Sequence, residues 1–133
     1  MTQPITNLNL LLKSMQPKLV SGKFVFCTIP KNKLLTLKIN PLLIFQEEEG
    51  VTLIVEKEVA DKNKLNYDKI WSLITLNVNS DLSAVGFLAA ITPALAKAGI
   101  SVNVVSAYHH DHLFVPEGKA REATKILQKL SSP

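Results

Sequence analysis

The fold is decided by the stretch Val104-Val105-Ser106-Ala107-Tyr108-His109-His110-Asp111-His112-Leu113-Phe114-Val115-Pro116. An apolar strand stops at a group of polar, ionisable residues, and a second apolar strand follows them. This pattern is typical of a β-hairpin with a polar tip. A hairpin tip is a place where a small domain can carry binding or catalytic residues. We therefore expect the tip to contribute to a functional site.

Strand and helix patterns alternate on both sides of this hairpin. Residues 70–78 are expected to form a strand buried mainly on one face, and Asn79–Ser83 offers side chains suited to helix capping. A helix is predicted over Ala84–Ala98, closed by Gly99. After the hairpin, Glu117–Leu130 has apolar residues at helical spacing. The C-terminal half therefore has the predicted order β-α-β-β-α.

This order is that of a ferredoxin-like unit without its last strand. The open edge is completed most simply by a strand from the N-terminal half, so we expect the two halves to interlock. The predicted fold class is α+β, with two interlocked halves whose antiparallel sheets are covered by helices. The expected boundaries are residues 1–66 for the N-terminal half and residues 67–133 for the C-terminal half, in one folding unit.

The N-terminal half is predicted to contain a short amphipathic helix, a buried strand and a hairpin, over Thr6–Met15, Lys23–Ile29, and Leu42–Gln46 with Val51–Val55. Thr6 is expected to cap the helix, and Gly50 to supply a positive φ at the hairpin turn. Residues 34–39 fit a loop or an edge strand equally. Residues 56–68 are polar and form the candidate linker, with one helical turn through Val59 and Ala60.

Composition indicates a folded domain and argues against a nucleic-acid partner. The chain has 133 residues, of which 47% are hydrophobic and 20% charged, which is ordinary for a globular protein. The net charge is +4, but acidic residues interrupt the lysines along the whole chain. Arg121, Lys125 and Lys129 form a stripe that we interpret as the solvated face of a helix. Because basic residues are not concentrated and only 6% of residues are aromatic, no nucleic-acid partner is expected.

The sequence also favours a cytoplasmic protein without a membrane anchor. No apolar run approaches the roughly 20 residues that cross a bilayer, and the N-terminus has no basic segment followed by a hydrophobic one. The single cysteine, Cys27, lies in an apolar run, which predicts a buried core thiol in a reducing compartment.

The helix predicted over Ala84–Ala98 is apolar on nearly all sides, and Lys97 is its only charged residue. One face of such a helix can rest on a sheet, but the remaining apolar surface needs a second layer, a second domain or another subunit as its cover. Among these, we expect a homodimer. Pro93 removes a backbone donor inside this helix and predicts a kink.

The polar tip is compatible with more than one chemistry. His109, His110, Asp111 and His112 invite a metal hypothesis, because imidazole and carboxylate are good ligands for zinc. However, His109 points away from the other two histidines on an extended strand, and the chain has no further histidine. Alternatively, His112 is a packed strand residue whose ring bonds Asp111 or the backbone. We predict no dedicated metal site and no cofactor.

Catalytic motifs are also missing from the sequence. Ser80 and Ser83 lie in a predicted turn, but Gly-x-Ser-x-Gly is absent, and capping is the expected role of Ser83. The phosphate-binding pattern Gly-x-x-x-x-Gly-Lys-Ser/Thr is absent too, and the chain contains only 5 glycines. We therefore predict no enzyme and assign no catalytic residue.

Two stretches resemble the ACT domain, a ferredoxin-like module that senses amino acids. The first is Ser80-Asp81-Leu82-Ser83-Ala84-Val85-Gly86-Phe87-Leu88, in which Gly86 occupies the family's glycine position. The second runs from Ala96 to Val105 and continues from Tyr108 to Pro116. It is similar to small stand-alone bacterial proteins with two ACT-like halves, whose relatives include arginine-sensing proteins. Phe24–Pro30 and Glu49–Leu53 resemble their N-terminal half, so the similarity spans nearly the whole chain.

The resemblance implies an amino-acid-binding regulatory module without catalytic activity of its own. A helix N-terminus with unpaired N–H groups can bind the ligand carboxylate, and Gly86 permits close approach. The resemblance implies a ligand-binding set made of Ser80, Asp81, Leu82, Ser83, Ala84, Val85, Gly86, Ala107, Tyr108, His110 and Asp111. Two alternatives stay open, namely a small metal-dependent enzyme using the histidine-rich tip and a protein-interaction subunit that has lost its ligand.

Overall fold

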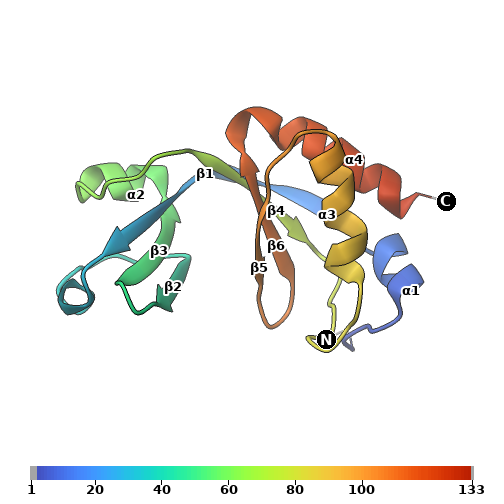
Figure 1. Cartoon of the computed structure of the whole chain (residues 1–133), viewed down its shortest axis with the longest axis horizontal. Helices are drawn as coiled ribbons and strands as arrows, with labels where there is room; N and C mark the ends of the chain where they lie inside the picture. Colours follow the sequence, from blue (N-terminus) through green and yellow to red (C-terminus); the bar gives the residue numbers. More distant parts are fainter. Residues whose placement is uncertain (1–2, 133) are drawn as a thin grey trace. The chain divides into compact units, whose positions relative to one another are not determined.

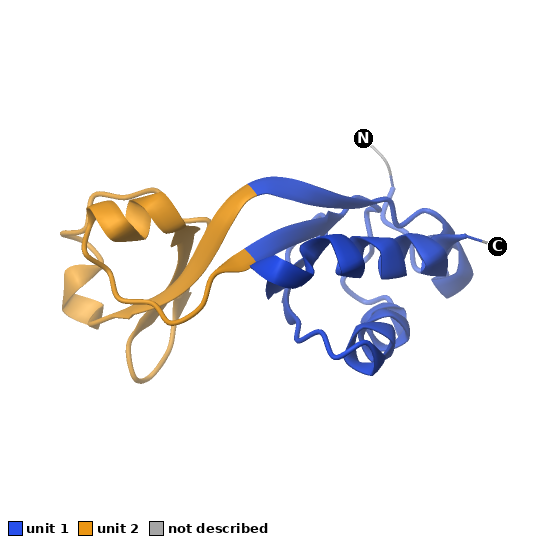
Figure 2. Ribbon diagram, turned by 90° about the horizontal axis from the view of Figure 1, so that it is seen from above, with its two compact units in different colours: residues 1–21, 72–133 blue, residues 22–71 orange. Residues whose placement is uncertain are grey.

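The computed structural model describes residues 3–132. The chain divides into two compact units, unit 1 with residues 1–21 and 72–133 and unit 2 with residues 22–71 (Figure 2). The helices are α1 (Leu8–Lys13), α2 (Lys57–Lys62), α3 (Phe87–Lys97) and α4 (Ala120–Ser131), with short 3-10 helices η1 (Lys31–Lys33) and η2 (Glu117–Lys119). The strands are β1 (Pro17–Ile29), β2 (Leu43–Gln46), β3 (Val51–Glu56), β4 (Trp71–Leu76), β5 (Asn103–Ser106) and β6 (Asp111–Pro116) (Figure 1).

Unit 1 contains the hairpin that dominates the sequence pattern. Its strands follow the hydrogen-bonded order β1-β4-β6-β5, and α1, α3 and α4 pack against one another. The N-terminal part of β1 is the strand that completes the C-terminal sheet. Just beyond the two strands, the amides of Asn77 and Val78 donate to the carbonyls of Gln16 and Met15. The core of unit 1 includes fully buried side chains from both strands and helices, Leu11, Ile74, Leu76, Ile91, Leu95, Leu113, Val115 and Leu127.

Unit 2 is built on a smaller antiparallel sheet with the order β2-β3-β1. The register places Ile29 opposite Val51 and Val25 opposite Val55. These β-branched side chains are buried, as is Cys27, whose thiol has a pKa raised by burial. Cys27 is thus the core thiol that its apolar run predicts.

The two units repeat the same order of elements. In unit 2 the order is β1-η1-β2-β3-α2, and the order β4-α3-β5-β6-α4 follows in unit 1. In both, the second strand of the hairpin lies beside the leading strand and the first hairpin strand lies at the sheet edge. This is the ferredoxin-like arrangement, so the predicted α+β class with two similar halves is confirmed. Because β1 contributes to both units, the compact units differ from the linear halves of the sequence.

Several predicted boundaries are wrong for identifiable reasons. Helix α1 is capped by Asn7, whose side chain accepts from the amide of Leu10, and Thr6 lies outside the helix. Helix α3 begins at Phe87 after Gly86, because Asp81 and Ser83 bond each other in the preceding loop. The C-terminal end of α3 agrees with the prediction, as does the apolar stripe of α4.

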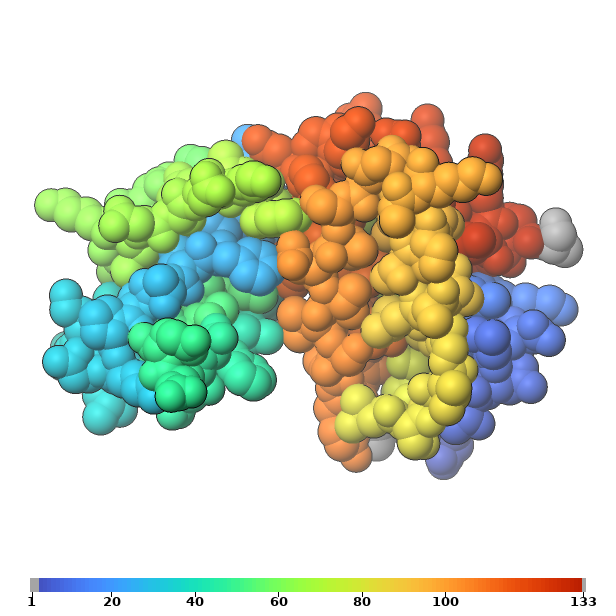
Figure 3. All heavy atoms as spheres, in the orientation of Figure 1, coloured from blue at the N-terminus to red at the C-terminus, as the bar shows by residue number. Residues whose placement is uncertain are grey.

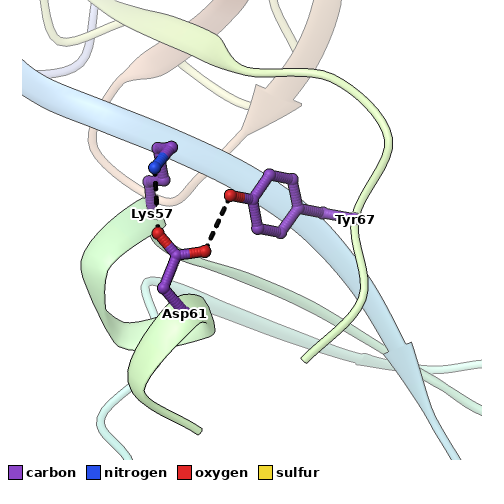
Figure 4. Close-up of polar contacts among 3 residues, drawn as sticks. All are labelled: Lys57, Asp61 and Tyr67. Atoms are coloured by element: carbon purple, nitrogen blue, oxygen red, sulfur yellow. Dashed lines mark hydrogen bonds and ion pairs between the residues drawn. The ribbon is translucent and has the colours of Figure 1, made fainter. Parts of the chain in front are cut away.

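The polar segment 56–68 is not a simple linker. It contains the whole of α2 and lies inside unit 2. Lys57 and Asp61 form an ion pair of 2.9 Å, and the Tyr67 hydroxyl donates to the other Asp61 oxygen over 2.7 Å (Figure 4). The hydrogen bond from Lys57, followed by the one from Tyr67, lowers the pKa of Asp61. The hydrogen bond to Asp61 and the charge of that carboxylate raise the pKa of Lys57. These contacts hold the chain after α2 against the helix.

Within residues 3–132, the longest helices fall short of the length and apolar character that crossing a membrane requires.

Position 50 requires glycine because a Cβ would not fit there, and not because the backbone has a positive φ. Its φ is not among the positive values of the described glycines, which belong to Gly22, Gly86 and Gly99. A Cβ at position 50 would lie 2.9 Å from the carbonyl oxygen of Ile29 and 3.3 Å from the Thr28 hydroxyl. The β2–β3 turn therefore packs directly onto the end of β1.

We predict that Gly50→Ala destabilises the fold by about 1–3 kcal/mol, because backbone atoms must move to admit the methyl group. Urea unfolding measures this change. Gly118→Ala is the matched control, since a Cβ there meets nothing within 4 Å. It should stay within about 0.5 kcal/mol of the wild type. A G50A protein as stable as G118A would contradict the packing described.

Candidate ligand-binding site

A cavity of about 220 Å³ lies in unit 1 between the loop before α3 and the β5–β6 hairpin. In the space-filling view this loop, in yellow, lies beside the hairpin, in orange (Figure 3). This volume is below the range of about 300–1,000 Å³ for drug-sized ligands. The cavity suits a small metabolite. It is lined by Ser80, Asp81, Leu82, Ala84, Gly86, Phe87, Leu88, Ala89, Ser106 and Asp111.

One wall of the cavity is the N-terminus of α3. Gly86 has a φ of 90°, a left-handed conformation that L side chains rarely adopt, and it turns the chain into the helix. Its carbonyl accepts the first helical bond, from the amide of Ala90. The amides of Phe87, Leu88 and Ala89 have no intrahelical acceptor, and the N-cap residue Gly86 has no side chain to cap them. This wall therefore offers N–H donors and the positive end of a helix dipole.

The lining of the cavity also includes a buried carboxylate. Asp111 is only 6% exposed, and the Ser80 hydroxyl donates to its Oδ2 over 2.9 Å. Ser80 is itself held by the N-terminal segment, because the Ile5 amide donates to Asn79 and the Asp81 amide donates to Ile5. Burial of a carboxylate is costly unless charge-assisted hydrogen bonds compensate, and a single hydroxyl leaves acceptor capacity on the second oxygen. The lining of the cavity thus contains both N–H donors and a carboxylate acceptor.

Asp81 also lines the cavity, but its side chain is engaged locally. Its Oδ1 accepts hydrogen bonds from both the hydroxyl and the amide of Ser83. The hydrogen bond from the Ser83 hydroxyl is the larger cause of a lowered pKa of Asp81, and the hydrogen bond from the Ser83 amide is the second. Ser83 therefore braces the loop and does not cap α3 as expected. Each of Asp111 and Asp81 therefore keeps one carboxylate oxygen that accepts none of these bonds, and Asp111 is the more buried of the two.

A second cavity of about 190 Å³ borders the same loop. It shares Ser80, Asp81 and Leu82 with the first and adds Pro4 and Tyr108. Tyr108 is 75% exposed. The phenol ring therefore borders this second hollow and not the cavity at the α3 N-terminus.

The residues predicted from the sequence thus divide into three groups. Ser80, Asp81, Leu82, Ala84, Gly86 and Asp111 line the main cavity, and Tyr108 lines the second. Four lie outside both linings, namely Ser83, Val85, Ala107 and His110. Val85 is 84% exposed, and Ala107 donates to His110 to close the hairpin turn. The prediction did not include Phe87, Leu88, Ala89 and Ser106, although the first three follow once the helix start is known.

The histidines of the tip do not gather into a metal site. No group of three or more His, Cys, Asp or Glu side chains that could hold a metal ion occurs within residues 3–132. His112 is the packed strand residue of the alternative interpretation, but its Nδ1 lies 3.0 Å from the Thr75 hydroxyl and does not bond Asp111. Asp111 starts β6 and is buried, instead of lying in the turn.

The corresponding position in unit 2 is built differently. There, only Pro30 separates β1 from η1, whereas residues 77–86 separate β4 from α3. The first residue after the β2–β3 turn is the apolar Val51, where unit 1 has Asp111. Because η1 is a single short turn, it offers no helix N-terminus comparable to that of α3. The N–H donors and the carboxylate acceptor of the unit 1 cavity therefore have no counterparts in unit 2.

The environment of His112 predicts a pH dependence of stability. Burial lowers the pKa of His112, the nearby His110 lowers it further, and Asp111 opposes the shift. The unfolded chain, with a histidine pKa near 6.5, therefore binds a proton before the folded one does. The contribution of His112 to the free energy of unfolding is therefore fully present above the pKa of the unfolded chain. It is lost as the pH falls through the lower pKa of the folded chain.

We expect the melting temperature of the wild type to decline between about pH 7 and about pH 5, and His112→Gln to reduce this slope. His109→Gln, at an exposed position of the same hairpin, should retain the wild-type slope. Calorimetry of the three proteins across this pH range measures the slope of melting temperature against pH. Equal slopes for H112Q and the wild type would contradict the role given to His112.

Comparison with known proteins agrees with this architecture. ACT-domain family models match residues 3–72 and residues 66–129. A crystal structure from Vibrio cholerae, of a protein of unknown function described as a possible transport protein, is 43% identical. It covers 94% of this chain and 96% of its own, with a TM-score of 0.81. No curated protein matches the sequence.

More distant structures share the fold alone. A protein from Agrobacterium tumefaciens is 15% identical with a TM-score of 0.69, over 86% of this chain and 87% of its own. The ligand-free regulatory subunit of aspartate kinase from Thermus thermophilus is 12% identical with a TM-score of 0.68, over 91% of this chain and 100% of its own. Both family models and the 43% identical structure support one assignment, and the chain belongs to the ACT-domain family, with two ACT halves.

Proposed function

We propose that this ACT-domain protein is a cytoplasmic regulatory module that binds a free amino acid in unit 1, has no catalytic activity of its own and acts as a homodimer. The observation that carries the proposal is the cavity whose lining contains both the N-terminus of α3 and the buried carboxylate of Asp111. ACT domains are regulatory ligand-binding modules, and the coarse assignment follows from family membership. The amino acid as ligand is argued from the chemistry of the cavity walls.

An amino acid is a zwitterion, and each of its charged groups matches one wall. The α-carboxylate fits the N–H groups of Phe87, Leu88 and Ala89, where the helix dipole favours an anion. The α-ammonium fits the second oxygen of Asp111, since a buried carboxylate gains most from a charge-assisted hydrogen bond. Ser106 adds a hydroxyl to the lining. A ligand with only one of these charges would leave one wall unsatisfied.

The same contacts argue against catalysis in this cavity. The Ser80 hydroxyl donates to a carboxylate, and a nucleophilic serine instead needs an imidazole that can accept its proton. The His112 ring lies against Thr75. Ser80 and Asp111 therefore form a structural pair that shapes the site.

The proposal predicts one amino-acid site per chain, because unit 2 lacks counterparts of both the donors and the acceptor. A thermal-shift screen of the natural amino acids should identify at least one that raises the melting temperature, since a concentration of about 100 times the Kd stabilises by about 2.7 kcal/mol. Isothermal titration calorimetry should then give a stoichiometry of one.

Each other outcome of this screen contradicts the proposal. Stabilisation by zinc or manganese that EDTA reverses, with no effect of amino acids, favours the metal-dependent enzyme. No stabilisation by either class of ligand favours an interaction subunit without a ligand. A stoichiometry of two would show that unit 2 binds as well.

Asp111→Asn tests the acceptor wall directly. The Asn oxygen can still accept from Ser80, so the fold should persist, while the charge that holds the ligand ammonium is lost. We expect affinity for the amino acid found in the screen to fall by roughly 10- to 100-fold, the equivalent of about 1.5–3 kcal/mol for a charged hydrogen bond.

Asp68→Asn is the matched control, because it removes the same charge at an exposed position of unit 2. It should bind as the wild type does. Equal affinities for D111N and D68N would remove Asp111 from the site.

A further inference from the structure

The loop that carries Ser80 and Asp81 is anchored by the start of the chain. The Ile5 amide donates to the Asn79 carbonyl over 2.8 Å, and the Asp81 amide donates to the Ile5 carbonyl over 2.9 Å. These two bonds form an isolated parallel bridge between Ile5 and Ser80. Residues 4–8, which we call the N-terminal strap, therefore lie against the loop that leads into α3 (Figure 1).

The N-terminal strap contacts both polar parts of the site without lining the main cavity. Through its bridge it fixes Ser80, whose hydroxyl donates to Asp111. The Leu8 side chain lies beside the start of α3, since its Cδ2 is 3.7 Å from where a Cβ on Gly86 would be. In the part of the chain that the structure describes, the lining residues of this cavity all come from positions 80–111. The strap can therefore affect a ligand only by positioning the groups that bind it.

The attachment of the strap is limited enough to be reversible. Ile5 is half-buried against the core of unit 1, but its neighbours Pro4 and Thr6 are exposed. Pro4 also borders the second cavity of about 190 Å³, so the packing on this side of the strap is incomplete. A segment near a chain terminus that has few buried contacts opens more easily than a core strand does. The strap therefore has a docked state and an accessible detached state.

We propose that docking of the N-terminal strap and binding of the amino acid stabilise each other, which makes the strap a regulatory element of the site. The inference rests on the proposed function. With the strap docked, Ile5 holds the loop in the place where Ser80 bonds Asp111. With the strap detached, the loop loses these two main-chain anchors, and the ligand must order the loop as it binds, which lowers the affinity. Coupling of this kind is reciprocal, so a bound ligand also holds the strap in place.

Ile5→Ala tests the coupling, because it removes the apolar anchor of the strap and leaves the lining of the cavity unchanged. The probe is an equimolar mixture of the natural amino acids, titrated while the melting temperature of the full chain is measured. We expect the concentration of mixture needed for a given rise in melting temperature to be about tenfold higher in I5A. Ile126→Ala is the matched control, since Ile126 is also a half-buried isoleucine packed against the core of unit 1 but lies on α4. It should destabilise the free protein and need no more of the mixture than the wild type does.

Hydrogen exchange gives a second readout, which a merely structural role of the strap would not change. When the mixture is added to the wild type, the amide of Ile5 should exchange more slowly, because the bound ligand keeps its bond to Asn79 closed. Ile5 does not line the cavity, so the ligand cannot protect this amide by direct contact. The Glu47 amide, which donates to Gly50 in unit 2, is the control and should exchange at an unchanged rate.

The outcomes separate failure of the coupling from failure of the site. If I5A needs no more of the mixture than I126A does, or if the mixture leaves exchange of the Ile5 amide in the wild type unchanged while raising its melting temperature, the strap is not coupled to the ligand and the amino-acid site stands. A wild type whose melting temperature the mixture does not raise would overturn the proposed function and, with it, the role of the strap.

Discussion

The hydrogen bond between Ser80 and the buried carboxylate of Asp111 is the interaction on which the site depends. It joins the loop after β4 to the first residue of β6, two segments 31 positions apart in the sequence. The bond partly compensates the desolvation of the carboxylate, and it fixes Asp111 in the lining of the cavity that the start of α3 also lines. A zwitterion bound to both groups would complete the compensation, which gives the ligand a physical reason to bind.

The repeat explains why only one unit carries such a site. Both units use a leading strand, a helical segment and a hairpin, but the link between strand and helix is a single proline in unit 2 and a long loop in unit 1. The long loop leaves room above the hairpin, whereas the tight turn at Gly50 closes onto Ile29. The two copies of one fold have thus diverged.

Sequence patterns among neighbouring residues predict much of this structure, but they do not predict the hydrogen bonds between residues that are distant in the sequence. The alternation around residues 104–116 predicts the β5–β6 hairpin, and Gly99 marks the end of α3, because each depends on neighbouring residues only. The start of α3 was missed since Asp81 and Ser83 look like caps yet bond each other. The resemblance assigns Asp111 to the site, but its hydrogen bond with Ser80 follows only from the fold. Likewise, position 50 requires glycine because of the nearby Ile29 carbonyl, which belongs to another strand.

The central claim is that the first amides of α3 hold the carboxylate of an amino acid. Two-dimensional amide NMR of the 15N-labelled chain, titrated with the amino acid that stabilises it, observes these groups directly. The account predicts that the resonances of Phe87, Leu88 and Ala89 move downfield together and saturate with the same Kd, while amides of unit 2 stay in place. Binding that leaves these three resonances unchanged and shifts others would contradict the account.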